Sequence, residues 1–184
     1  MKTFVAAIGI VVLSASSLLA EPYNTDARQK VLGHDYGGYR SYTARAYQSN
    51  ARTHASALHE YKKVAGVVPK DVAEEHAAEV RRNVGMVDKQ LAKLEKSVKS
   101  DKVAVDLIAQ ILKHHANALE SCGMVEEECA KEKPGDSEVS SCCTTMTDEL
   151  TAASEAHTKL MKHLKIPTES PKPKATIKSP KATK

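Results

Sequence analysis

The segment KDVAEEHAAEVRRNVGMVDKQLAKLEKSV, residues 70–98, decides the fold class. Its apolar residues recur at alternating steps of three and four, the spacing of a helix that buries one stripe against neighbouring helices. These positions are Ala73, Ala77, Val80, Val84, Val87, Leu91, Leu94 and Val98. We therefore predict one long helix within a helical bundle.

The segment that precedes it has the same character. A helix is expected over about 42–65, because Gly66 can stop a helix and Pro69 can open the next one. Aromatic residues are only 4% of the chain, and Ala, Lys, Glu and Leu dominate it. Such a composition is typical of an all-α protein.

Two further helices are expected downstream. The third begins near Asp101, a good N-cap residue, and ends either at Gly123 or at the breaker PGD, residues 134–136. The fourth runs from about Ser137 or Ser140 to Leu164. Short connections between long helices favour antiparallel neighbours, so we predict an up-down-up-down four-helix bundle of the ferritin-like kind.

The chain divides into four parts. Residues 1–20 have a lysine, an apolar core and a small residue at the end, as in a secretory signal peptide, which predicts export to the periplasm or the medium. Residues 21–41 form a Gly- and Tyr-rich extension, and residues 42–167 form the bundle. Residues 168–184 are Lys- and Pro-rich, as in a disordered tail. No later stretch is long and apolar enough for a transmembrane segment in the mature chain.

The positive charge of the chain belongs to its tail. The net charge of the chain is +4, and the tail alone has five lysines against one glutamate. With Lys2 in the signal peptide, Glu21–Pro167 carries a net charge of −1. This excludes a basic groove for nucleic acid on the bundle. The tail itself suits anionic polymers of the cell envelope.

Histidines occupy several predicted core positions. His54, His115 and His157 fall in the apolar seams of three different helices, and His76 flanks the seam of 70–98. Histidine is costly to bury without a partner. Three or four of them predict either a polar layer or a metal site, and a mostly imidazole site suits copper or zinc.

The heights of these residues along the helices can be compared across a turn. Reflection about residues 134–136 places His115 close to His157, with Cys129 beside Cys142. His115 and His157 are therefore the principal predicted ligands. His54 and His76 are auxiliary ones, because they lie further along the bundle.

Four cysteines surround the connection between the last two helices. In an exported protein an even number of cysteines predicts disulfides. Four cysteines allow three connectivities, of which the height comparison favours Cys129 with Cys142 and Cys122 with Cys143. The alternative is a soft-metal cluster for Cu(I), formed by Cys122, Met124, Cys142, Cys143 and Met146.

Three sequence features together resemble a family of proteins. They are HASALHEYKKVAGVVP from His54, KHHANAL around His115 and EAHTKLMKHL around His157. The pattern resembles that of a group of exported, functionally uncharacterised ferritin-like four-helix bundles that have a histidine on several helices. The resemblance covers about 120 residues and implies a ferritin-like bundle outside the cytoplasm. The four cysteines and the lysine-proline tail depart from it.

Two functions follow as hypotheses. One is an exported bundle that binds copper or zinc through core histidines. The other is a structural or envelope-associated interaction protein, pinned by disulfides and carrying a basic tail. No nucleophile paired with a base and no cofactor fingerprint emerges, so the sequence favours a non-enzymatic role.

Overall fold

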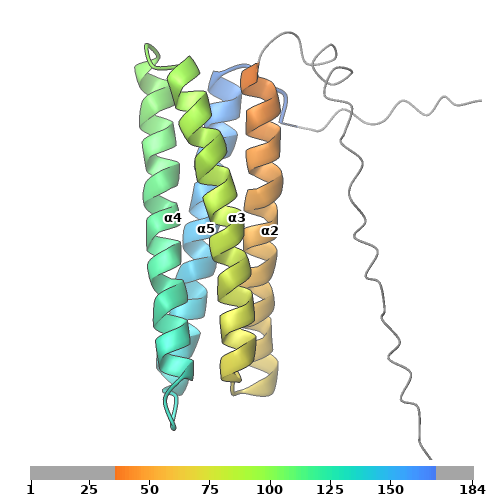
Figure 1. Cartoon of the computed structure of the whole chain (residues 1–184), viewed down its shortest axis with the longest axis vertical. Coiled ribbons are helices and arrows are strands. Elements are labelled where there is room, and N and C mark those ends of the chain that lie inside the picture. Colours follow the sequence, from red (N-terminus) through yellow and green to blue (C-terminus); the bar gives the residue numbers. More distant parts are fainter. Residues whose placement is uncertain (1–35, 169–184) are drawn as a thin grey trace, which may run out of the picture.

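The computed structural model describes residues 36–168, which form four α-helices. They are α2 (Tyr36–Ala65), α3 (Lys70–Ser97), α4 (Lys102–Cys129) and α5 (Asp136–His163). Figure 1 shows α2 and α4 running in one direction and α3 and α5 in the other. The described residues contain no strand. The predicted all-α, four-helix bundle is confirmed.

The helices form a ring in which each one packs against two others. Helix α2 contacts α3 and α5, and helix α4 contacts α3 and α5. The start of α2 and the end of α5 lie at one end of the bundle, here called the terminal end (Figure 1). The α2–α3 and α4–α5 connections lie at the other, here called the turn end. A layer of side chains can thus receive one residue from each helix.

The first helix is longer than the sequence predicts. It begins at Tyr36 instead of residue 42, so the last six residues of the predicted extension are helical. Glycine disfavours helices. Here, however, Gly38, Ser41 and Ala44 are all buried and give a small-residue face that packs closely. Tertiary packing overrides the local propensity. The rest of the extension lies outside the described residues.

The other predicted boundaries agree closely with the structure. Asp101 is the N-cap of α4, and its carboxylate accepts a hydrogen bond from the Ala104 amide at 3.0 Å. Gly66 has a φ of 75°, the left-handed conformation that ends a helix readily at glycine. Helix α4 passes through Gly123 and ends at Cys129, so the longer of the two predicted alternatives is right.

The core consists of two apolar clusters stacked along the bundle. The cluster near the turn end reaches as far as Ala51, Val84, Ala118 and Leu150. The cluster near the terminal end begins at Ala44, Val87, Ile111 and Ala153. Gln48 on α2 and His115 on α4 are buried between the two clusters. The polar layer of the core therefore lies near the junction of the two.

The predicted seam is right for α3 but partly wrong for α2. The first seven predicted positions of α3 are buried, and Val98 packs partly against the core. For α2 the three-four spacing predicts a seam of Tyr47, Ala51, His54, Leu58, Tyr61 and Ala65, but Tyr61, 39% exposed, and Ala65 face outward. The buried stripe of α2 is Ser41, Ala44, Gln48, Ala51, Ala55, Leu58 and Lys62. Gln48 and Lys62 thus take the places in the buried stripe that the spacing gave to Tyr47 and Tyr61.

Two predicted segments fall largely outside the structural description. The signal peptide, residues 1–20, and the tail beyond Thr168 are not among the described residues. Within residues 36–168, none of the helices combines the length and apolar character that crossing a bilayer requires.

Candidate functional site

Four polar side chains, one from each helix, form a connected layer in the bundle. Asp88 Oδ1 on α3 lies 2.6 Å from His115 Nδ1 on α4. His115 Nε2 lies 3.3 Å from the Gln48 amide nitrogen on α2. The Gln48 amide oxygen lies 2.9 Å from His157 Nδ1 on α5. All four helices are linked through this one chain of hydrogen bonds.

The chain of hydrogen bonds has a fixed direction. An ionised carboxylate only accepts, so Asp88 requires a proton on His115 Nδ1. In the neutral imidazole, His115 Nε2 then accepts from the Gln48 amide group. The Gln48 oxygen in turn accepts from the Nδ1–H of His157. The lone pair on His157 Nε2 is left buried without a hydrogen-bond partner among the described residues.

The environment keeps His157 neutral. The side chain is 1% exposed. Burial lowers the pKa of His157 to about 4, and electrostatic interactions with Arg45 and with the His115 ring act in the same direction. Because this pKa lies well below 7, the imidazole has an available lone pair at neutral pH.

The predicted closeness of His115 and His157 is confirmed, since both bind the amide of Gln48. Their shared partner also limits what they can do. Both ring nitrogens of His115 have partners, so a metal at His115 would have to displace Gln48 or Asp88. The arrangement therefore corresponds to the polar layer, one of the two alternatives that the sequence left open. Metal ligation by these two residues stays a prediction.

The other two predicted ligands form a separate pair. His54 Nδ1 on α2 lies 3.4 Å from His76 Nδ1 on α3, and the ring centroids are 5.5 Å apart. Glu79 Oε2 lies 3.9 Å from the opposite nitrogen of His54, Nε2. The side chain of His54 is 34% exposed, and that of His76 is also half-buried. This pair is open to solvent, in contrast to the polar layer.

The surroundings of the pair favour the neutral form of His76. Burial lowers the pKa of His76, and the nearby charge of His54 lowers it further, whereas Glu75 acts in the opposite direction. A hydrogen bond from Arg82 lowers the pKa of the Glu79 carboxyl group. Glu79 therefore stays ionised beside His54.

The four histidines thus belong to two places in the bundle. Across residues 36–168, no three His, Cys, Asp or Glu side chains are grouped so that they could hold a metal ion. Sequence reasoning missed Gln48 and Asp88, which organise the polar layer. Gln48 follows Ser41 and Ala44 at steps of three and four, and this register of α2 was the signal that could have found it.

The four cysteines lie at the turn end of the bundle. Cys122, Cys129, Cys142 and Cys143 are buried free thiols. Cys142 is close enough to Cys129 to raise the pKa of that thiol, after the larger effect of burial, which agrees with the predicted proximity. The disulfide pairings stay predictions. Met124, a candidate in the alternative copper cluster, is 51% exposed and lies outside the interior.

Comparison of the chain with family models, curated proteins and solved structures found no match.

Proposed function

We propose that this protein is an exported, non-enzymatic bundle that binds a transition metal of the copper or zinc class at His54 and His76. The observation that carries the proposal is the 3.4 Å separation of their Nδ1 atoms. Two nitrogens that bind one tetrahedral metal, each at about 2.0–2.1 Å, lie about 3.4 Å apart. The side chains already have the separation that such a metal requires.

The surroundings of the pair support this assignment. Metal-bound histidines commonly donate their other ring N–H to a carboxylate, which fixes the tautomer. The Glu79 carboxylate lies on that side of His54, 3.9 Å from Nε2, which is longer than a hydrogen bond. The lowered pKa of His76 removes the proton that would compete with a metal at neutral pH.

The number of ligands decides the kind of metal binding. Closed structural zinc sites have four protein ligands, whereas this pair supplies two. Water would complete the coordination, so the metal would exchange readily. This suits reversible binding, as in a metal buffer. In this proposal the polar layer of Gln48, His115 and His157 does not bind the metal and instead holds the four helices together.

Metal titration of the purified chain from Glu21 onward tests the proposal. We expect Zn²⁺ and Cu²⁺ to bind at one equivalent, and the His54→Ala, His76→Ala double variant to lose this binding. His114→Ala is the matched control, because His114 is also half-buried and has a carboxylate partner, Glu149, at 2.7 Å. Unchanged metal binding in the double variant would rule out this pair as the site.

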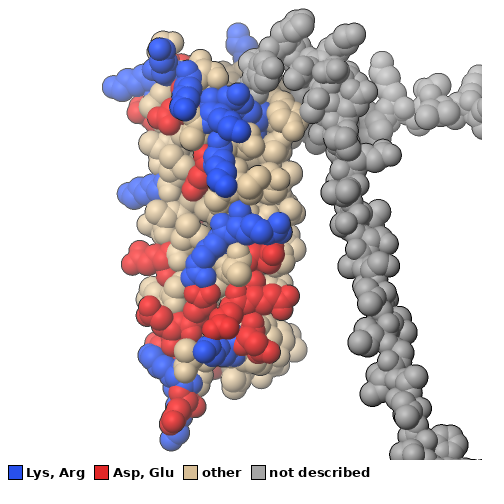
Figure 2. Space-filling view, in the orientation of Figure 1, with Lys and Arg blue, Asp and Glu red and all other residues tan. Residues whose placement is uncertain are grey.

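The envelope-interaction hypothesis is the second candidate, and the surface charge favours it. Figure 2 shows lysine and arginine side chains gathered towards the terminal end and acidic side chains towards the turn end. The lysines include the exposed residues Lys89, Lys93, Lys96, Lys99 and Lys102. The described residues end at Thr168, near this basic end, and the lysine-rich tail follows Thr168 in the sequence. The lysines of the terminal end and those of the tail would together attract an anionic polymer through salt-sensitive contacts.

Deletion of residues 168–184 tests this second candidate. We expect the deletion to reduce retention on a column of immobilised anionic polymer, and the loss to diminish as salt is raised. Equal retention of the full and shortened chains would count against it. Metal binding at His54 and His76 should be the same in both chains, which separates the two proposals.

A further inference from the structure

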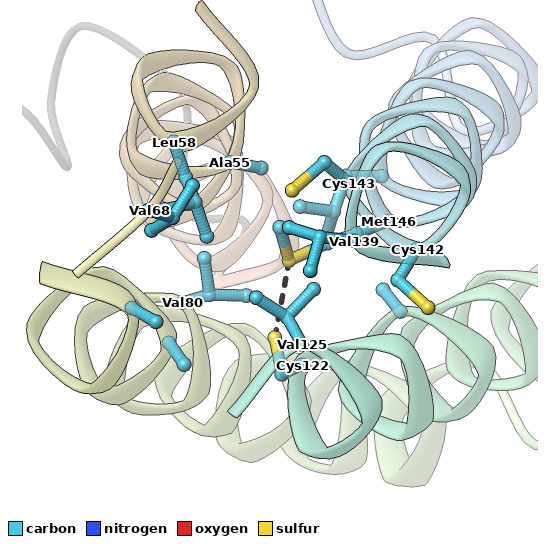
Figure 3. Packing of buried hydrophobic residues seen from close by; sticks show 14 of the residues in the cluster. Ala55, Leu58, Val68, Val80, Cys122, Val125, Val139, Cys142, Cys143 and Met146 are labelled. Carbon is cyan, nitrogen blue, oxygen red and sulfur yellow. Dashed lines mark hydrogen bonds between the residues drawn. The ribbon is translucent and has the colours of Figure 1, made fainter. Parts of the chain in front are cut away.

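A second group of metal-ligating side chains lies in the core at the turn end. The thiol of Cys122 on α4 donates to the Met146 sulfur on α5, with Sγ and Sδ 3.2 Å apart (Figure 3). Cys143 lies one turn before Met146 on α5, and Figure 3 shows its sulfur directed into the bundle interior. All three side chains are 0% exposed. Three sulfur atoms from two helices therefore share one buried region.

Electrostatic effects link the two thiols and place a cation beside each. Burial raises the pKa of Cys122 to about 12, and the neighbouring Cys143 also raises it, while Arg81 lowers it. Burial raises the pKa of Cys143 to about 11, Cys129 and Cys142 raise it further, and Lys62 acts in the opposite direction. Lys62 is only 7% exposed, so a buried cation lies near this part of the core.

We propose that Cys122, Cys143 and Met146 form a binding site for Cu(I), separate from the histidine pair. Thiolate and thioether ligands are soft and select Cu(I) over harder divalent ions. The close Cys122–Met146 contact supplies one thiol and one thioether, and Cys143 supplies the second thiol. The site is assembled from α4 and α5, whereas the histidine pair belongs to α2 and α3.

The binding step balances without an oxidant or a reductant. Copper enters as Cu⁺, each of the two thiols loses its proton, and each sulfur forms a bond to the metal. One Cu⁺ therefore releases two protons and leaves a bis-thiolate complex with a net charge of −1. Arg81 and Lys62 lie where their positive charges would stabilise this complex. Their present partners are Glu126 and Asp136, both towards the surface.

Cys143 also borders a surface pocket, although its side chain is closed to solvent. It lines a surface pocket of about 240 Å³ together with His59, Lys62, Ser140 and others at the turn end. A metal delivered to this pocket would meet Cys143 first. Cys122 and Met146 lie on the interior side and would complete the coordination.

Burial of the thiols limits their oxidation. Burial raises the pKa of Cys122 to about 12, and thiol–disulfide exchange requires the thiolate. A soft metal also binds the thiolate, so each proton has to leave as Cu(I) binds.

Anaerobic titration of the reduced chain from Glu21 with Cu⁺, in competition with a chromogenic Cu(I) chelator, tests the site. We expect one Cu(I) per chain and release of two protons. Cys122→Ala with Cys143→Ala should abolish this binding. Met146→Leu keeps both thiols and nearly the same volume, so it should fold and lower the affinity for Cu(I) about tenfold or more.

Cys142→Ala is the matched control, because Cys142 is also a buried cysteine and directly precedes Cys143 in the sequence. It should leave Cu(I) affinity unchanged, as should the His54→Ala, His76→Ala variant. The proposal is overturned if the wild-type chain cannot compete for Cu(I), if Met146→Leu binds as the wild type does, or if Cys142→Ala abolishes binding. Because the histidine variant retains this site, failure here and failure of the histidine proposal are distinguishable.

Discussion

His157 donates its Nδ1–H to the side-chain oxygen of Gln48 at 2.9 Å and leaves its Nε2 buried without a hydrogen bond among the described residues. One nitrogen of the ring is fully used, and the other is available only to a group that can donate a proton or accept a lone pair. Protonation of Nε2 would place a positive charge in the core near Arg45 and His115, both of which lower the pKa of His157.

The stability of the protein should consequently depend on pH. The pKa of His157 falls from 6.5 in the unfolded chain to about 4 in the folded protein, so between these values the unfolded state binds more protons. The contribution of the neutral His157 to the free energy of unfolding is fully present above pH 6.5 and is lost as the pH falls through 4. The total loss is about 3 kcal/mol. Urea unfolding at several pH values measures it, and His157→Gln should reduce this pH dependence, since glutamine does not titrate.

Gln48 should be more important for stability than its polar character suggests. Gln48→Leu leaves the Nδ1–H of His157 and the Nε2 of His115 without partners in the core. We expect a loss of roughly 2–4 kcal/mol in the free energy of unfolding, measured by chemical denaturation. The triple variant, with His115→Leu and His157→Leu added, removes the unpaired groups and should be more stable than Gln48→Leu alone. Additive losses in the triple variant would contradict a coupled layer.

Asp88 should determine the tautomer of His115. The hydrogen bond between them is 2.6 Å long, and the Asp88 side chain is 38% exposed. Because solvent screens this carboxylate, Asp88→Ala should cost only about 1 kcal/mol. The sharper measurement is NMR of the His115 ring nitrogens, where we expect the Nδ1–H form in the wild type and a mixture in the variant. Asp106→Ala, an exposed carboxylate on the same helix as His115, should change neither quantity.

The apolar clusters should dominate stability outside the polar layer. Leu150 is fully buried in the cluster near the turn end. Leu150→Ala should lower the free energy of unfolding by about 2–5 kcal/mol, because it removes buried methyl groups and leaves a cavity. Val64 is 85% exposed, and Val64→Ala should change the same quantity by less than about 0.5 kcal/mol. Similar losses in the two variants, measured in urea, would contradict the burial described here.

The sequence predicted the positions of the helices better than it predicted which face of each helix is buried. The three-four spacing of α3 is carried by valine and leucine, which have only one favourable environment, so its buried stripe was predicted correctly. On α2 alanines occur on several faces, and alanine contributes too little apolar area to select one. The buried face of α2 instead follows Gln48, because its amide binds His115 on α4 and His157 on α5. A pattern within α2 alone does not contain these contacts.

The same reasoning explains the partial success at the site. Counting along the helices from the last turn correctly brought His115 to His157, because both belong to consecutive antiparallel helices with a defined turn. It did not pair His54 with His76. Their contact depends on how α2 and α3 are rotated about their axes, and a one-dimensional count of heights contains no rotation. The ring nitrogens nevertheless lie 3.4 Å apart.

The directed chain from His157 through Gln48 and His115 to Asp88 has one more consequence, for how the four helices choose their alignment. Repeated alanine, valine and leucine stripes can pack against each other in several registers with similar burial. Displacement of any one helix by a turn, about 5.4 Å, would separate at least one donor from its acceptor and leave it buried. The polar layer therefore penalises slipped alignments more than it strengthens the correct one, so its main contribution is a unique native arrangement.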